Sequence, residues 1–212
     1  DRVLVLNGTR EGLYNAAMVL CPETKNGEQP VVLLPNPFYQ VYAIAALSVN
    51  AEPVMVPATA QTGHLPDYAS VDPDILDRTT IAYICSPANP QGAVATREYW
   101  ATLIGLAEKH DFKIFADECY SEIYRDTPPM GALEAAADTG CDPERIVAFD
   151  SLSKRSNLPG LRSGFVVSGP NNTREMRQLS AYAGAPLPLP IQRVSTRVWS
   201  DEDHVIANRE MY

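Results

Sequence analysis

The sequence predicts an α/β fold of three layers, in which helices cover both faces of a mostly parallel sheet of seven strands. Two observations support this prediction. Short apolar runs alternate with segments of helical periodicity, and the runs are continuously apolar rather than one-sided. Strands of that kind are typical of a parallel sheet that is buried on both faces. The chain has 212 residues, 45% of them hydrophobic, which is enough for one large core.

The predicted elements alternate along the whole chain. Strands are expected, by residue number, at 3–6, 31–34, 53–56, 81–85, 113–116, 146–149 and 164–167. Helical spacing marks 11–20, 39–50, 97–110 and 174–182, and a final helical region follows a proline-rich break at 185–190. Since no linker or internal repeat divides the chain, residues 1–212 are expected to form one domain.

Charge and composition exclude several classes of function. The net charge of −9 argues against nucleic acid or an anionic membrane as a partner, and no apolar run approaches the ~20 residues that span a bilayer. The four cysteines are scattered and accompanied by only three histidines, which predicts no metal site and a cytoplasmic protein with reduced thiols. Cys85 and Cys119 lie in apolar runs and are expected to be small core residues.

Polar residues follow the first two strands, where ligands of such sheets bind. The turn at Gly8, Thr9 and Arg10 opens a helix and offers backbone N–H groups to an anion; a plain N-cap by Asn7 or Thr9 is the alternative. An aromatic ring at Tyr39 suits stacking on a flat ligand, and core packing of Tyr39 or Tyr42 is the alternative.

Two further strands also end in polar residues. Asn89, between two prolines, offers an amide donor, although a simple Asn-Pro turn has the same pattern. Asp117 closes an apolar strand, where a carboxylate is costly unless a cation such as a protonated ring nitrogen meets it. Tyr120 follows three residues later and is expected to reach the same ligand; an N-cap aspartate is the alternative for Asp117.

Residues 151–164 contain Lys154 among small hydroxyl residues. A lysine in such a place is a candidate for an imine with an aldehyde, and Arg162, with Ser151 and Ser153, for binding a phosphate. A surface loop with solvated charges is the alternative. Together, the five sites supply a phosphate cup, a stacking face, a donor for a phenolic oxygen, a counter-ion for a pyridine nitrogen and an imine lysine. These features predict pyridoxal 5′-phosphate as the cofactor.

The set Asn89-Pro90-x-Gly92, Asp117-x-x-Tyr120 and Ser151-x-Ser153-Lys154-x7-Arg162 resembles the class I/II aminotransferases of fold type I. Residues 7–11, 36–40, 117–122 and 151–165 resemble bacterial N-succinyldiaminopimelate aminotransferases in particular. The resemblance covers the whole chain. It implies that residues 1–212 are the large cofactor-binding domain of such an enzyme.

The resemblance also implies a role for each residue of the site. Lys154 would bind the cofactor covalently and shuttle the substrate proton, and Asp117 would keep the pyridine nitrogen protonated. Tyr39 would stack on the ring, while Asn89 and Tyr120 would bind its phenolic oxygen. The residues expected around the phosphate are Gly8, Thr9, Arg10, Ser151, Ser153 and Arg162. Arg155 is expected to be a loop cation.

The implied reaction is amino-group exchange between glutamate and an N-succinyl-2-amino-6-oxopimelate type of acceptor, in lysine biosynthesis. The implied protein is a homodimer whose partners are amino acids and 2-oxo acids. The chain opens at Asp1 on a predicted strand and closes on a predicted helix at 201–212, so we expect a fragment. A tyrosine before Asp1 and a carboxylate-binding arginine after Tyr212 would complete it. The alternatives are another aminotransferase specificity, a β-lyase of the same fold, or a non-catalytic regulatory domain.

Overall fold

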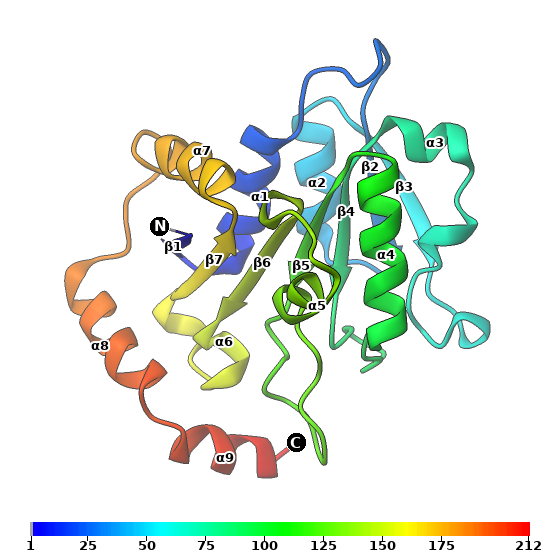
Figure 1. Cartoon of the computed structure of the whole chain (residues 1–212). Helices are drawn as coiled ribbons and strands as arrows, with labels where there is room; N and C mark the ends of the chain where they lie inside the picture. The colour runs from blue at the N-terminus through cyan, green and yellow to red at the C-terminus, as the bar shows by residue number, and fades with distance from the viewer. Residues whose placement is uncertain (1) are drawn as a thin grey trace.

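One sheet of seven strands forms the centre of the computed structural model, which describes residues 2–212 (Figure 1). Its strands are β1 (Val3–Leu6), β2 (Val31–Asn36), β3 (Glu52–Pro57), β4 (Thr79–Cys85), β5 (Lys113–Asp117), β6 (Ile146–Ser151) and β7 (Gly164–Ser168). They are ordered β1-β7-β6-β5-β4-β2-β3. Strands β2 to β6 pair in parallel, and β7 is antiparallel to both of its neighbours. The predicted α/β fold with a mostly parallel sheet is confirmed.

Helices cover both faces of this sheet. Their bounds are α1 (Thr9–Leu20), α2 (Gln40–Ser48), α3 (Pro73–Arg78), α4 (Arg97–Lys109), α5 (Ala132–Thr139), α6 (Leu152–Arg155), α7 (Pro170–Ser180), α8 (Leu189–Trp199) and α9 (Asp203–Glu210). Helices α4 and α5 lie on the face that is nearer in Figure 1, and α1 and α2 lie on the other. The molecule therefore has the three layers that the apolar runs predict.

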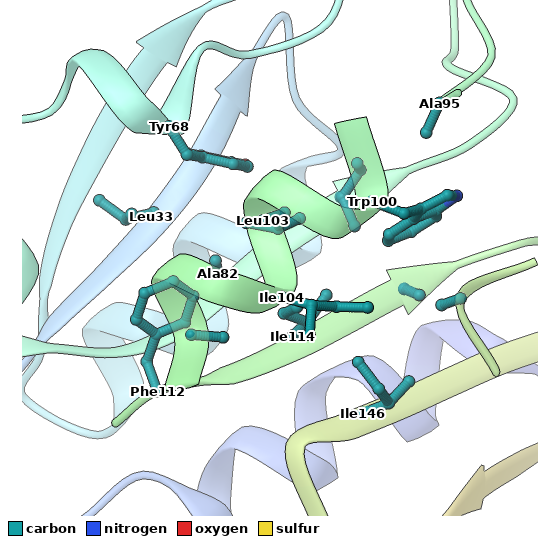
Figure 2. Packing of buried hydrophobic residues seen from close by; sticks show 14 of the residues in the cluster. Leu33, Tyr68, Ala82, Ala95, Trp100, Leu103, Ile104, Phe112, Ile114 and Ile146 are labelled. Atoms are coloured by element: carbon teal, nitrogen blue, oxygen red, sulfur yellow. The ribbon is translucent and has the colours of Figure 1, made fainter. Parts of the chain in front are cut away.

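The core consists of one apolar cluster on each face. On the α4 face, Trp100 and Leu103 pack against Ile114 and Ile146 of the central strands (Figure 2). On the other face, Leu13 of α1 and Tyr42 of α2 pack against Phe115 and neighbouring strand residues. Because the central strands β4 and β6 are buried on both faces, their sequences are mostly apolar, and their polar residues are Thr79 and Thr80 at the start of β4 and Asp150 and Ser151 at the end of β6.

Several element boundaries differ from those predicted. The strands β5 and β6 extend past their apolar residues to include Asp117 and Ser151, which keep the backbone hydrogen bonds of the sheet. Helix α7 begins at Pro170 rather than at residue 174, because proline suits the first turn of a helix. Helix α2 ends at Ser48, since Asn50 has a φ of 56° and cannot continue it.

The register of the sheet places the site at one edge. Cys85 at the end of β4 pairs with Asp117 at the end of β5, which in turn pairs with Phe149 of β6. The carboxyl ends of β4, β5 and β6 therefore lie side by side, as expected for a ligand site in this class of sheet. Within residues 2–212, no helix is long and apolar enough to cross a membrane, and no cluster of His, Cys, Asp or Glu is arranged to hold a metal ion.

Candidate functional site

A cavity of about 270 Å³ opens at the carboxyl edge of the sheet. Every predicted site residue except Gly8 lines it, although these residues come from segments spread over most of the chain. They are Thr9, Arg10, Tyr39, Asn89, Asp117, Tyr120, Ser151, Ser153, Lys154 and Arg162. The structure thus gathers them around one space, while their roles toward a ligand stay predictions.

Asp117 lies deep in this cavity, at the end of β5, with a side chain that is 6% exposed. The Tyr42 hydroxyl donates to its Oδ2 at 2.7 Å, and the Cys119 N–H donates to its Oδ1 at 3.4 Å. Burial raises the pKa of Asp117, and these two hydrogen bonds oppose the rise. Asp117 is a strand residue and caps no helix, so the N-cap alternative is wrong. Within residues 2–212, no cationic side chain pairs with the Asp117 carboxylate.

Lys154 is held on the single turn of α6, directly after β6. Ser151 begins this turn, because its hydroxyl accepts the N–H of Ser153 at 3.4 Å. The Lys154 Nζ lies 5.6 Å from the centre of the Tyr120 ring, and the Asn208 amide donates to the Lys154 carbonyl at 3.0 Å. Lys154 is therefore half-buried on an ordered helix at the cavity, which contradicts the alternative of a solvated surface loop.

The start of α1 and the Arg162 guanidinium form one wall of the cavity. Gly8 precedes the helix with a φ of 81°, and no side chain caps the helix, so the N-cap alternative for Asn7 or Thr9 is wrong. Gly8 does not line the cavity but lies close to Arg162, since a Cβ atom at Gly8 would come within 2.9 Å of the Arg162 Cζ. Arg162 donates through Nη2 to the Asn7 carbonyl at 3.3 Å and through Nη1 to the Pro159 carbonyl at 2.8 Å.

Cys119 connects two hydroxyl groups of this wall. Its Sγ lies 3.1 Å from the Thr9 Oγ1 and 3.5 Å from the Ser151 Oγ. Cys85 also lines the cavity. The prediction that these two cysteines are only core residues is therefore incomplete: Cys119 is buried, as predicted, but both face the cavity. Such contacts join residues far apart in sequence, so sequence spacing offers no signal for them.

Aromatic rings also border the cavity. Tyr39 lines the cavity, accepts a hydrogen bond from the Arg10 Nε, and packs edge-on against Tyr42 with 5.7 Å between ring centres. Tyr42 is 1% exposed, so core packing is the correct interpretation of this residue, yet it also borders the cavity. The hydrogen bond between Tyr42 and Asp117 is not predicted by the sequence.

Asn89 and Tyr120 lie where this cavity adjoins a second one of about 630 Å³. Asn89 sits in a tight turn, since the Gly92 N–H donates to the Ala88 carbonyl at 2.7 Å, so a turn is present as well as the predicted cavity position. Burial raises the pKa of Tyr120 to about 12, helped by the nearby Cys85 and Asp117. The Tyr120 hydroxyl therefore keeps its proton at neutral pH and can donate it in a hydrogen bond.

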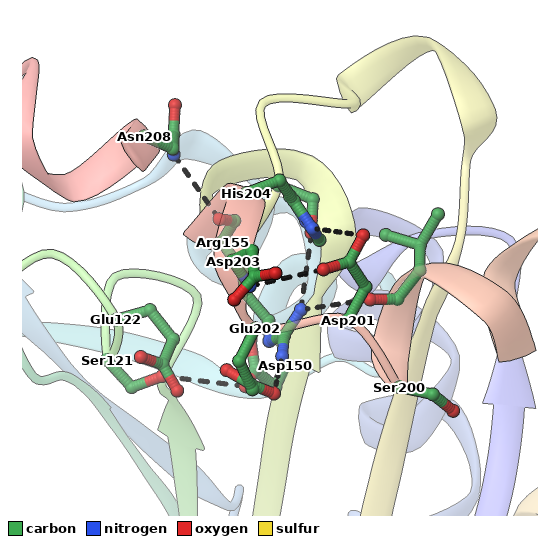
Figure 3. A network of polar contacts seen from close by, with 12 residues as sticks. Ser121, Glu122, Asp150, Arg155, Ser200, Asp201, Glu202, Asp203, His204 and Asn208 are labelled. Carbon is green, nitrogen blue, oxygen red and sulfur yellow. Dashed lines mark hydrogen bonds and ion pairs between the residues drawn. The ribbon is translucent and has the colours of Figure 1, made fainter. Parts of the chain in front are cut away.

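Arg155 differs from the prediction. It is 4% exposed rather than a loop cation, and it pairs with Glu202 (Figure 3). Its Cζ lies 4.8 Å from the centre of the Trp199 ring. The reason is that α8 and α9 return to cover α6, which a local reading of residues 151–164 cannot show.

Comparison with known proteins defines the class. The family described as aminotransferase class I and II matches residues 1–211, and the chain belongs to it. The chain is 32% identical over 208 residues to an LL-diaminopimelate aminotransferase of Dehalococcoides mccartyi, covering 97% of this chain and 51% of that protein. It is also similar to the crystal structure of an aminotransferase from Neisseria meningitidis, with a TM-score of 0.92 and 40% identity, covering 99% of this chain and 53% of that one.

A probable N-succinyldiaminopimelate aminotransferase of Thermus thermophilus has a TM-score of 0.87 and covers 98% of this chain and 54% of that one. At 24% identity, that likeness shows the fold alone. The predicted preference for a succinylated substrate is therefore not confirmed. The chain spans about half the length of the relatives that it matches.

The family depends on pyridoxal phosphate, which confirms the predicted cofactor. The donor set of the cavity fits that molecule. One wall offers a guanidinium, hydroxyl groups and helix N–H groups to a phosphate, and the interior offers a buried carboxylate with no cation of its own. Lys154 supplies an amine on the same cavity.

Proposed function

We propose that this chain is the cofactor-binding domain of an aminotransferase that exchanges an amino group between glutamate and a diaminopimelate-type substrate. The observation that supports it is the meeting of Lys154, Asp117 and Arg162 around one cavity of about 270 Å³. Membership of the class I and II aminotransferase family supports the same reaction class.

Each wall of the cavity has a task in this proposal. Arg162, Ser151 and the N–H groups of Thr9 and Arg10 bind the cofactor phosphate, and Tyr39 packs against the ring. Pyridoxal phosphate, when bound, supplies an aldehyde that condenses with amines and a ring that accepts electrons from the bond being broken. Asp117 holds a proton on the ring nitrogen.

The remaining polar groups act on the reacting side of the ring. Asn89 and Tyr120 donate hydrogen bonds to the phenolic oxygen. Lys154 provides the amine that binds the aldehyde, and its Nζ then moves the substrate proton. Tyr39, Tyr42 and Pro35 also border the cavity.

Two forms of diaminopimelate are candidates for the substrate. The sequence resemblance favours N-succinyl-LL-diaminopimelate, in a lysine-biosynthetic reaction. The curated relatives of Dehalococcoides mccartyi and Halothermothrix orenii are named LL-diaminopimelate aminotransferases, which favours the free amino acid. We further propose a cytoplasmic homodimer, in which residues 1–212 form the large domain and another part of the protein supplies the arginine that binds the substrate carboxylate.

The intact protein with pyridoxal phosphate should absorb visible light, and borohydride should fix the cofactor to Lys154. Lys154→Arg keeps the charge but cannot form the bond, so the fixed adduct should disappear; Lys109→Ala, on the exposed end of α4, should retain it. An adduct that persists in Lys154→Arg, measured by peptide mass spectrometry, contradicts the proposal.

Half-reaction rates separate the substrates. Glutamate, LL-diaminopimelate and N-succinyl-LL-diaminopimelate are mixed singly with the loaded protein, and the loss of visible absorbance is followed. We expect glutamate and one diaminopimelate to react. If neither diaminopimelate form reacts faster than alanine or aspartate, the proposed substrate class is wrong.

A further inference from the structure

The Asp117 carboxylate depends on a residue of another element for its short hydrogen bond. Tyr42 of α2 and the Cys119 N–H donate to it, at 2.7 Å and 3.4 Å. The first is the shorter and is made by a side chain 75 residues away in sequence. Rotation of the carboxylate about its Cβ–Cγ bond would break it, so Tyr42 restrains the orientation of Asp117.

The Tyr42 ring is itself held firmly. It stacks on Tyr83 with 4.4 Å between ring centres and an interplanar angle of 12°, and Tyr39 packs edge-on against it. The Tyr83 ring is in turn packed edge-on against Phe115 with 5.2 Å between ring centres, and its hydroxyl donates to the Leu13 carbonyl at 2.8 Å. Since the Tyr42 ring is 1% exposed and packed on both sides, its hydroxyl has no room to move away from Asp117.

The direction of this hydrogen bond is fixed as well. Burial, and then the charge of Asp117, raise the pKa of Tyr42 well above its ordinary value. The phenol therefore keeps its proton over the whole working range of pH. A protonated phenol beside a carboxylate can only donate, and such a bond stabilises the ionised form of the acid.

We propose that Tyr42 is a positioning residue, which holds the Asp117 carboxylate ionised and oriented toward the ring nitrogen of bound pyridoxal phosphate. The inference rests on the proposed function and assigns a role to a residue that never touches the reacting atoms. Without the Tyr42 hydroxyl, Asp117 would hold a proton more tightly and draw it from the ring nitrogen. The ring would then withdraw fewer electrons, and the Lys154 nitrogen bound to the cofactor would keep its own proton to higher pH.

The test compares Tyr42→Phe with Tyr83→Phe in the intact protein. Each change removes one buried hydroxyl and keeps the ring, but the second hydroxyl bonds a backbone carbonyl rather than Asp117. Tyr42→Phe should weaken binding of pyridoxal phosphate by about tenfold or more, the usual effect of losing a hydrogen bond to a charged group. It should also raise the pH midpoint of the visible absorbance. Tyr83→Phe should leave both values at those of the wild type.

A second comparison keeps the inference testable if stability changes. In Asp117→Asn, adding Tyr42→Phe should produce no further shift of the midpoint, because the proposed effect passes through the carboxylate. A wild-type affinity and midpoint in Tyr42→Phe, or an equal shift in both backgrounds, would overturn the inference. A wild-type protein with no visible band would instead refute the proposed function itself, so the two failures are distinguishable.

Discussion

Gly8 leaves room for the Arg162 guanidinium behind the start of α1. Its φ of 81° lies in the region that side-chain-bearing residues rarely adopt, and a Cβ atom would overlap the Arg162 Nη2. The guanidinium is the flexible end of its side chain, so it would move rather than the helix. Gly8 is thus tied to the cavity through Arg162, although it does not line it.

Replacing Gly8 with alanine should therefore weaken cofactor binding, because the added methyl group would displace the Arg162 guanidinium. The matched control is Gly63→Ala, because Gly63 has a φ of 63° and no atom near the added methyl. Gly63→Ala should lose about 1–2 kcal/mol of unfolding free energy, because Gly63 is left-handed helical, and Gly8→Ala should lose more, because a φ of 81° with a ψ of 157° is adopted almost only by glycine. Only Gly8→Ala should bind pyridoxal phosphate less tightly in a fluorescence titration; equal affinities for the two variants would show that Arg162 has not moved.

The residue chemistry at strand ends was enough to predict which side chains meet at the cavity. Asp117 could be predicted because a charge that ends an apolar strand is costly, and Lys154 because it stands among small hydroxyl residues eight positions before Arg162. The contacts of the Tyr42 hydroxyl and of the Cys119 thiol could not be predicted from the sequence. Their partners lie 75 and 110 residues away, and neither residue type is unusual in a core.

At the scale of elements, α6 depends on the helices that cover it. A helix of one turn is not stable alone, and α6 carries Lys154. Arg155 of α6 pairs with Glu202 (Figure 3) and packs on Trp199, while the Asn208 amide donates to the Lys154 carbonyl. The α8 and α9 segment therefore holds the lysine in place.

Arg155→Ala should loosen this arrangement. The loss of the ion pair with Glu202 and of the contact with Trp199 should cost about 2–3 kcal/mol of unfolding free energy. Amide exchange should accelerate in α6 and α8, and borohydride should fix less cofactor to Lys154. The control is Arg197→Ala, an exposed position on α8. If exchange in α6 is the same in both variants, α8 and α9 do not support it.

The elements differ in how far the sequence reveals them. All seven strands were predictable, since a strand buried on both faces is a continuous apolar run. Helices α3, α5 and α6 were not, because six, eight and four residues are too few to show a clear helical period. Helix α8 was predicted only as part of a final helical region. It is amphipathic, but it buries only Ser195 and leaves the apolar Leu189 and Val194 exposed, so its apolar residues do not mark a face toward this core.

At the scale of the whole molecule, buried acids make stability depend on pH. Burial raises the pKa of Asp150 to about 8, against a hydrogen bond from the Ser151 N–H and with the nearby Glu118 adding to the rise. Burial also raises the pKa of Glu118 to about 7. Both values exceed the ~4 of an unfolded chain. Between about pH 4 and pH 8 the folded protein therefore binds more protons than the unfolded one, and its stability should fall as the pH rises.

Asp150→Asn should remove much of this fall. The amide oxygen can still accept the Ser151 N–H, which donates to Asp150 Oδ1 at 2.6 Å, and the neutral side chain carries no cost of ionisation in the interior. The intact variant should match the wild type near pH 4 and exceed its unfolding temperature by a margin that grows between pH 5 and pH 8, by about 2–4 °C for each kcal/mol gained. Thermal unfolding from pH 4 to pH 8.5 measures this, with the exposed Glu134→Gln on α5 as the control. Parallel curves for Asp150→Asn and the wild type would mean that Asp150 is already ionised in the fold, whereas a shallower slope in Asp150→Asn alone identifies this buried carboxyl as a source of the pH dependence.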